Sequence, residues 1–226
     1  MKRKGKGLIV ALDVDSPASA RALVRRLGGS VDFYKIPPAL SLRDPTLVPW
    51  LRRAGKKMFL DHKWYDIPSQ MRRSVQAAGR AGVTSCTVHV SAGLAALRAA
   101  ASLRPRPLLW GVSVLTSFTN RDLRDIGVGS SVPAQVCRLA RLAEKAGLEG
   151  LICSPQELPL LKKTSLTLVT PGIRLGRASA RDDQARSMTP REAWSNGARW
   201  IVVGRPILES GDPLAAVREI LRERPC

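Results

Sequence analysis

The sequence has few of the residues that build metal centres and disulfide frameworks. Its 226 residues include four cysteines and two histidines, and the cysteines form no Cys-x-x-Cys pair. A zinc centre needs several such ligands at short spacing, so no metal site is expected. Three of the cysteines lie in apolar stretches, which is typical of reduced, buried thiols in a cytoplasmic protein.

Long apolar runs are also absent. No stretch approaches the ~18 apolar residues of a membrane span, so the sequence predicts no membrane segment. Residues 1–6 are basic, as the start of a signal peptide would be, but the apolar run that follows is short and leads into Asp13. We therefore interpret residues 1–6 as a short frayed terminus that precedes a strand.

Acidic and aromatic residues are scarce relative to basic ones. There are 18 Asp and Glu against 37 Lys and Arg, a formal net charge of +19, and aromatic residues make up 4% of the chain. The excess is arginine scattered along the chain, which favours a solvated basic surface. A basic nucleic-acid-binding module is the weaker interpretation, because no binding motif or aromatic cluster accompanies the charge. We expect no specific nucleic-acid partner.

What the chain does contain is an alternation of short apolar runs and longer amphipathic stretches, repeated eight times. The runs have the length of strands buried on both faces, and the stretches between them begin and end with helix-capping residues. Eight such units without a linker predict an α/β fold, a (β/α)8 TIM barrel, as a single domain over residues 1–226. An open doubly wound sheet usually has fewer strands, and no Gly-x-Gly-x-x-Gly follows the first strand.

The element boundaries follow from the same pattern. The expected strands are Leu8–Leu12, Asp32–Ile36, Lys57–Asp61, Ser85–Val90, Leu108–Leu115, Gly150–Cys153, Thr167–Thr170 and Trp200–Val203. The expected helices begin at Ser16 or Pro17 and end at Gly28, and continue with 44–54, 67–81, 92–103, 133–146, 155–162, 190–196 and 213–224. The glycine-containing segment 125–129 is predicted to be a flexible loop.

Charged residues collect where such a barrel places its chemistry, at the carboxyl ends of the strands. Asp13 follows the first expected strand, Lys35 lies near the end of the second, and Asp61 and Lys63 close the third. Residues two apart in a strand share a face, so Asp61 and Lys63 are expected to point the same way. With Lys35 and Asp66 they form a row of Lys, Asp, Lys and Asp, in which each charge helps to keep its neighbours ionised. An ordinary Asp–Lys bridge at the barrel end is the alternative.

A second cluster lies late in the chain. Residues 170–174 read Thr-Pro-Gly-Ile-Arg after the seventh strand, and residues 204–206 read Gly-Arg-Pro after the eighth. Loops at these two places commonly bind phosphate, because glycine lets the backbone approach and arginine supplies a fork of donors. The late cluster therefore predicts a phosphate site opposite the charged row.

Together these motifs resemble the orotidine 5′-phosphate decarboxylases. The most specific element is Asp-x-Lys-x-x-Asp-Ile-Pro at residues 61–68, with Ala-Leu-Asp at 11–13 and Lys35 upstream and the late cluster downstream. The resemblance runs from about Leu8 to the last helix. It implies conversion of orotidine 5′-phosphate to UMP and CO2 in de novo pyrimidine biosynthesis. It also implies a homodimer with active sites at the interface, and catalysis without a cofactor or metal.

The resemblance also implies residue roles. Lys63 would stabilise and protonate a C6 carbanion, Asp61 would lie beside the departing carboxylate, and Asp66 would reach into the partner subunit's site. Lys35 would hold Asp61 and the ribose hydroxyls. The implied substrate-binding residues are Asp13, Lys35, Gln70, Thr116, Ser117, Arg174, Gln184, Gly204 and Arg205.

Several positions depart from the family pattern. Gln70 stands where threonine is usual, and Pro37 and Pro38 stand where a glycine usually follows the lysine of the second strand. His62 replaces a more typical apolar residue and should point away from the barrel interior. Two alternatives stay open: a catalytically impaired paralogue, and a magnesium-dependent sugar-phosphate decarboxylase or aldolase of the same suprafamily. The latter enzymes carry an acidic residue where Lys35 stands, since the metal needs an oxygen ligand.

Overall fold

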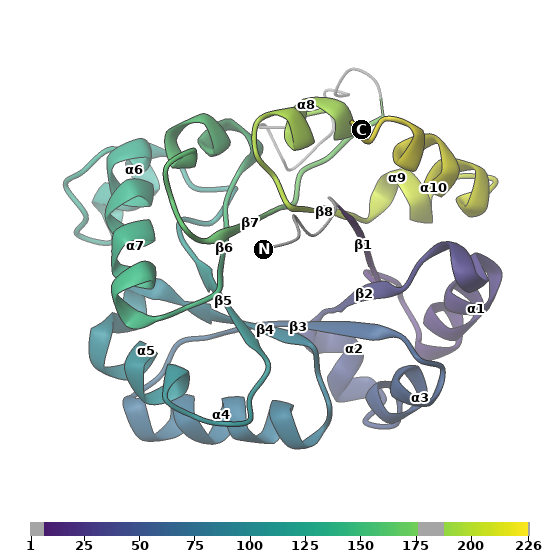
Figure 1. Ribbon diagram of the computed structural model, residues 1–226, viewed down its shortest axis with the longest axis horizontal. Helices are drawn as coiled ribbons and strands as arrows, with labels where there is room; N and C mark the ends of the chain where they lie inside the picture. The colour runs from purple at the N-terminus through teal and green to yellow at the C-terminus, as the bar shows by residue number, and fades with distance from the viewer. Residues whose placement is uncertain (1–6, 176–187, 226) are drawn as a thin grey trace.

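The computed structural model describes residues 7–175 and 188–225, and these form a closed barrel of parallel strands surrounded by helices (Figure 1). The strands pair in sequence order, and the last closes on the first. This confirms the predicted (β/α)8 TIM barrel. The strands are β1 (Gly7–Ala11), β2 (Phe33–Ile36), β3 (Lys57–Trp64), β4 (Ser85–His89), β5 (Leu108–Val112), β6 (Gly150–Ile152), β7 (Thr167–Thr170) and β8 (Trp200–Val203).

The helices cover the outside of the barrel (Figure 1). Several begin as their sequences predict: Ser16 caps the first by accepting the amide of Ser19, and Asp212 caps the last. The α-helices are α1 (Pro17–Leu27), α2 (Pro38–Arg43), α3 (Leu47–Arg53), α4 (Pro68–Arg80), α5 (Gly93–Ala101), α6 (Asn120–Asp125), α7 (Val132–Ala146), α8 (Pro190–Ser195), α9 (Arg205–Leu208) and α10 (Pro213–Arg222). Three 3-10 turns are η1 (Gly28–Ser30), η2 (Val90–Ala92) and η3 (Pro155–Leu161).

The strand predictions agree within a few residues, and the larger differences are in the helices. Helices α2, α6 and α9 were not predicted, because each is four to six residues long and too short to show a helical period. Segment 125–129, predicted as a flexible loop, begins with the last residue of α6. The predicted helix 155–162 is the 3-10 turn η3, in which Pro159 has no amide to donate. Residues 1–6 lie outside the described ranges.

The barrel interior is filled by apolar side chains on alternate residues of the strands. This inner cluster is separate from the larger core between the strands and helices. Its members are Ile9, Ala11, Phe33, Phe59, Trp110, Val169 and Val202. Lys35 lies two residues beyond Phe33 on β2 and pairs in register with Phe59, so this charged residue stands at the upper edge of the apolar filling.

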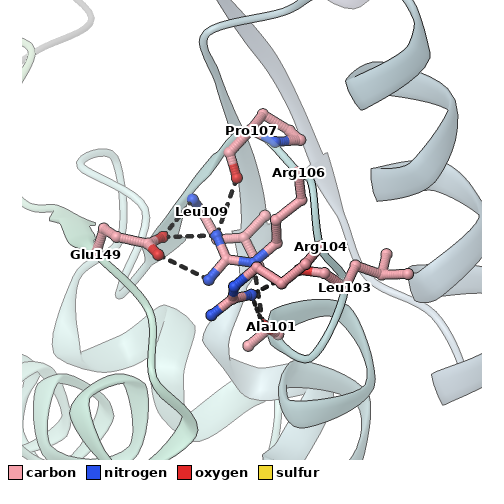
Figure 2. Close-up of polar contacts among 7 residues, drawn as sticks. All are labelled: Ala101, Leu103, Arg104, Arg106, Pro107, Leu109 and Glu149. Carbon is pink, nitrogen blue, oxygen red and sulfur yellow. Dashed lines mark hydrogen bonds and ion pairs between the residues drawn. The ribbon is translucent and has the colours of Figure 1, made fainter.

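The amino end of the barrel is held by a partly buried ion pair between the segments that lead into β5 and β6 (Figure 2). Arg106, with 4% of its side chain exposed, reaches Glu149 at 2.7 and 2.9 Å. It also donates to the carbonyls of Ala101 and Pro107, while Glu149 accepts the amide of Leu109. We call these groups the Arg106 clamp.

The longest helix in the described ranges, α7, has 15 residues, and none of the helices described there is long and apolar enough to cross a membrane.

Candidate active site

Four of the predicted residues meet at the carboxyl end of the barrel. The Lys35 ammonium lies 3.0 Å from the Asp13 carboxylate and 3.7 Å from Asp61 Oδ2. The Lys63 ammonium lies 2.8 Å from the same Asp61 oxygen. We call Asp13, Lys35, Asp61 and Lys63 the charged row. The charges alternate in sign along the row, which includes Asp13 in place of the Asp66 that the sequence pattern suggested.

The two central members of the charged row are buried, and the members at its two ends are partly exposed to solvent. The side chains of Asp61 and Lys35 are 11% and 14% exposed, whereas those of Lys63 and Asp13 are 38% and 48% exposed. The Asp61 carboxylate is therefore held deep between two ammonium groups, and the Lys63 ammonium stands at the open side. A small molecule at the mouth of the barrel could reach Lys63 and Asp13, the exposed members at the two ends of the row.

An irregularity in β3 sets the position of Lys63. Leu60 pairs with Cys86 and Trp64 with Val88, so four steps along β3 match two along β4. Within this bulge Lys63 has φ +50°, in the left-handed region, unlike every other non-glycine residue in the described ranges. Such a conformation costs about 1–2 kcal/mol in an L-residue and is concentrated at functional sites. The bulge re-aims the lysine so that its ammonium returns to Asp61.

Thr87 is a site residue that the sequence reasoning did not identify. It lies on β4, is fully buried, and its hydroxyl donates to Asp61 Oδ1 at 3.0 Å and accepts the Lys63 amide at 2.9 Å. A threonine in a strand ordinarily indicates only β propensity. The alternation of strand residues could have identified it. Ser85 pairs with Phe59, which faces the barrel interior, and Thr87 lies two residues further along β4, so it faces the interior as well.

Asp66 does not join the charged row within one chain. It is exposed, its carboxylate accepts the amide of Ile67 at 2.7 Å, and it forms no ion pair with any described residue. Gln70, on α4, is also exposed. Tyr65 and Ile67 on either side of Asp66 are large apolar side chains that solvent contacts. The segment carrying Asp66 is therefore an exposed, partly apolar edge beside the site.

The late cluster meets the charged row at β8. Gly204 follows β8 and caps α9, which begins with Arg205. A Cβ on Gly204 would lie 3.6 Å from Asp13 Oδ2, so the ends of β1 and β8 are in contact there. A methyl group at Gly204 would therefore be in ordinary van der Waals contact with the first member of the row.

After β7, the backbone around Arg174 is fixed by pairing with Met188. The Arg174 amide donates to the Met188 carbonyl, and the Met188 amide donates to Gly172. The Arg174 guanidinium donates to the carbonyl of Ile173 at 2.9 Å. Arg174 is thus placed on the same end of the barrel as Gly204, whereas Gln184 lies outside the described residues.

Thr116 and Ser117 follow β5, with Thr116 half-buried and Ser117 exposed. Beside them is a pocket of about 370 Å3 between the ends of β4 and β5 and helices α6 and α7. Its wall includes Tyr65, His89, Ser113, Leu115 and Phe118. This pocket adjoins the charged row without including it.

The two histidines flank the row. Burial lowers the pKa of His62 and that of His89, and the charge of Lys63 lowers both further while Asp61 opposes the shift. The Ser41 hydroxyl donates to the Pro38 carbonyl, so it accepts a hydrogen bond from His62 Nε2 at 2.8 Å. His62 therefore contacts α2 outside the barrel, in agreement with the expectation that it points away from the interior.

The Pro37 and Pro38 departure has a local explanation. Pro37 is the N-cap of α2 and Pro38 its first residue, a position that tolerates a missing amide. The chain after Lys35 thus turns directly into a short helix where a glycine was expected.

The site offers electrostatics and proton transfer rather than a nucleophilic thiol. Burial raises the pKa of the Cys86 and Cys153 thiols to about 12, so neither forms a thiolate near neutral pH. Over residues 7–175 and 188–225, no three His, Cys, Asp or Glu side chains are grouped so that they could hold a metal ion. The Lys63 ammonium can stabilise negative charge and donate a proton at the barrel mouth.

Comparisons with protein families, with individual proteins and with solved structures all point to the same family. Residues 6–220 match the model of the orotidine 5′-phosphate decarboxylase / HUMPS family. The orotidine 5′-phosphate decarboxylase of Opitutus terrae is 42% identical over 96% of this chain and 97% of its own length. That of Pseudomonas aeruginosa is 43% identical over 96% of both chains. The crystal structure of the Lactobacillus acidophilus enzyme superposes with a TM-score of 0.85 at 31% identity, covering 98% of this chain and all of that one. The chain belongs to the orotidine 5′-phosphate decarboxylase / HUMPS family.

Proposed function

We propose that this chain is an orotidine 5′-phosphate decarboxylase, a carboxy-lyase that forms UMP and CO2 in pyrimidine biosynthesis. The observation that carries the proposal is the Lys63 ammonium, 2.8 Å from buried Asp61 at the open side of the charged row. The names of the full-length relatives support the same substrate. Because Cys86 and Cys153 are buried free thiols, we also expect the enzyme in the cytoplasm.

The reaction needs placed charge more than a reactive group. When the bond between C6 and the carboxylate breaks, the electron pair stays on C6 in the plane of the ring, where no adjacent carbonyl delocalises it. The Lys63 ammonium would stabilise this carbanion and then transfer a proton to C6. The neutral amine that results regains its proton from solvent, which its 38% exposure permits.

Asp61 and Lys35 would tune this step. Two like charges 4 Å apart repel by about 4 kcal/mol at an effective dielectric constant near 20. Repulsion between Asp61 and the substrate carboxylate would disappear as neutral CO2 leaves. Lys35, which lies between Asp13 and Asp61, would hold Asp61 in place and hydrogen-bond the ribose, which Asp13 would also contact.

The late cluster would bind the phosphate. Arg174, Gly204 and Arg205 lie at the same end of the barrel as the charged row, with Gly204 against Asp13. Thr116 and Ser117 would face the pyrimidine edge, and Gln184 would bridge base and phosphate. Phosphate binding far from C6 can lower the barrier when its energy is used to orient the substrate.

A homodimer would complete the site. Asp66 is exposed and makes no ion pair within the described chain, and Tyr65 and Ile67 beside it present apolar surface. A second copy packed on this edge would bury that surface and receive Asp66 next to its own Lys63. Gln70 would contact the partner from the same edge.

The first experiment follows the loss of ultraviolet absorbance of orotidine 5′-phosphate with EDTA present. We expect decarboxylation without added metal, a complete loss in Lys63→Ala, and an unchanged rate in Lys145→Ala, which removes an exposed lysine from α7. Dependence on magnesium would point to the sugar-phosphate enzymes of the suprafamily. No turnover at all would indicate an impaired paralogue, and a near-normal rate in Lys63→Ala would remove Lys63 from its role.

Subunit mixing tests the role of Asp66. Inactive Lys63→Ala and Asp66→Ala subunits, mixed equally and allowed to exchange, should recover about a quarter of the wild-type rate, because half the dimers are mixed and each has one intact site. Absence of recovery after demonstrated exchange would contradict an Asp66 that acts across the interface.

A further inference from the structure

The Thr87 hydroxyl connects Asp61 and Lys63, two neighbouring members of the charged row. A hydroxyl has one proton to donate and lone pairs to accept. Since the Lys63 amide can only donate, the Thr87 oxygen accepts from it, and its own proton goes to Asp61 Oδ1. The directions of both hydrogen bonds are therefore fixed.

This hydroxyl also fixes the orientation of the Asp61 carboxylate. Oδ1 receives Thr87 at 3.0 Å, and Oδ2 receives Lys63 at 2.8 Å with Lys35 at 3.7 Å. With each oxygen held from a different direction, the carboxylate cannot rotate without breaking a hydrogen bond. Lys63 alone would leave it free to turn about the Oδ2 contact.

The second hydrogen bond lies where the strand ladder is interrupted. Between the Leu60–Cys86 and Trp64–Val88 pairs the regular pairing of β3 with β4 is lost. The Thr87 side chain accepts the Lys63 amide inside this gap and so replaces a backbone acceptor. It does so at the residue whose φ of +50° is unfavourable for a side chain.

We propose that Thr87 is a positioning residue for decarboxylation, which holds the Asp61 carboxylate and the left-handed backbone of Lys63 in register with each other. The inference rests on the proposed function for its kinetic consequence. Thr87 sets the spacing between the ammonium and the carboxylate and does not itself touch the substrate. Because misplacement of a reacting group by about 1 Å can cost ~100-fold in rate, loss of the hydroxyl should lower kcat.

Three variants test this. Thr87→Val keeps the shape of the side chain and removes both hydrogen bonds, and we expect kcat to fall by about 10- to 100-fold with little change in KM. Thr87→Ser keeps the hydroxyl and should restore most of the rate. Ser85→Ala is the matched control: Ser85 is buried on the same strand, and its hydroxyl has no partner among the described residues. It should retain the wild-type kcat.

A kcat within two-fold of wild type in Thr87→Val, or a Thr87→Ser variant as slow as Thr87→Val, would overturn the proposal. A crystal structure of Thr87→Val provides a test that needs no turnover. We expect the Asp61 carboxylate to rotate or Lys63 to leave the left-handed region, and unchanged geometry at both residues would refute the inference. An inactive wild-type enzyme would instead count against the proposed function alone.

Discussion

Replacing Arg106 with methionine should lower the free energy of unfolding by about 3 kcal/mol and leave decarboxylation unchanged. The substitution removes four donated hydrogen bonds, to Glu149 twice and to the carbonyls of Ala101 and Pro107. Removing one partner of a buried ion pair costs about 3–5 kcal/mol. Glu149 is one third exposed and keeps the Leu109 amide, so solvent offsets part of the loss and the lower end applies.

Urea unfolding at one fixed protein concentration measures the effect. The matched control is Arg121→Met, which removes an exposed arginine paired with Asp125 at 3.9 Å on α6 and should cost less than about 0.5 kcal/mol. Combining Arg106→Met with Glu149→Gln should recover part of the loss, since no unpaired carboxylate remains. A loss below about 1 kcal/mol, or a parallel fall in kcat of the folded enzyme, would refute this view of the Arg106 clamp.

Three further outcomes are expected. Lys63→Gly should be at least as stable in urea as Lys63→Ala, although glycine usually costs about 1 kcal/mol relative to alanine, because φ at this position is +50°. The lowered pKa values of His62 and His89 mean that the unfolded chain binds more protons as pH falls below the ordinary value of 6.5, so the free energy of unfolding should decrease there. A His62→Gln, His89→Gln double variant should show a smaller decrease in the free energy of unfolding over the same pH range. Arg205→Ala should chiefly raise KM for orotidine 5′-phosphate.

Each of these outcomes has a clear contrary result. If Lys63→Gly were about 1 kcal/mol less stable to unfolding than Lys63→Ala, residue 63 would not have a left-handed backbone in the folded protein. Equal stability at pH 7.5 and 5.5 would show that neither histidine is buried in its neutral form. An unchanged KM in Arg205→Ala would remove that side chain from phosphate binding.

The sequence predicted the barrel well because its strands are short, apolar and regularly punctuated. The members of the charged row could also be predicted, since they lie at the carboxyl ends of the first three strands, which meet at one end of the closed barrel. Regular strand parity is not what joins Asp61 and Lys63, because both lie within the bulge in β3. Helices such as α2 and α9 were missed because their few residues contain no period to detect.

Other features depend on contacts between segments or between molecules, which the residue pattern of one strand or one chain does not show. The left-handed backbone of Lys63 arises from a mismatch between β3 and β4, which neither strand shows alone. The role of Thr87 also depends on that mismatch, because it leaves the Lys63 amide without a strand partner, and the Thr87 hydroxyl accepts it. The role of Asp66 depends on a second molecule, so neither the pattern nor one folded chain places it beside a lysine.

The apolar side chains that fill the barrel place a water-free layer of low dielectric constant next to the site. Phe33, Phe59 and Trp110 fill the barrel interior under and beside Lys35 and Asp61, whose side chains are only 14% and 11% exposed. Field lines spread poorly through such a medium and leave by the mouth, where a substrate would lie. A cavity in this apolar layer, for example in Phe59→Ala, would admit water next to Lys35 and Asp61. It would weaken their electrostatic interaction with a bound substrate and change no group that a nucleotide contacts.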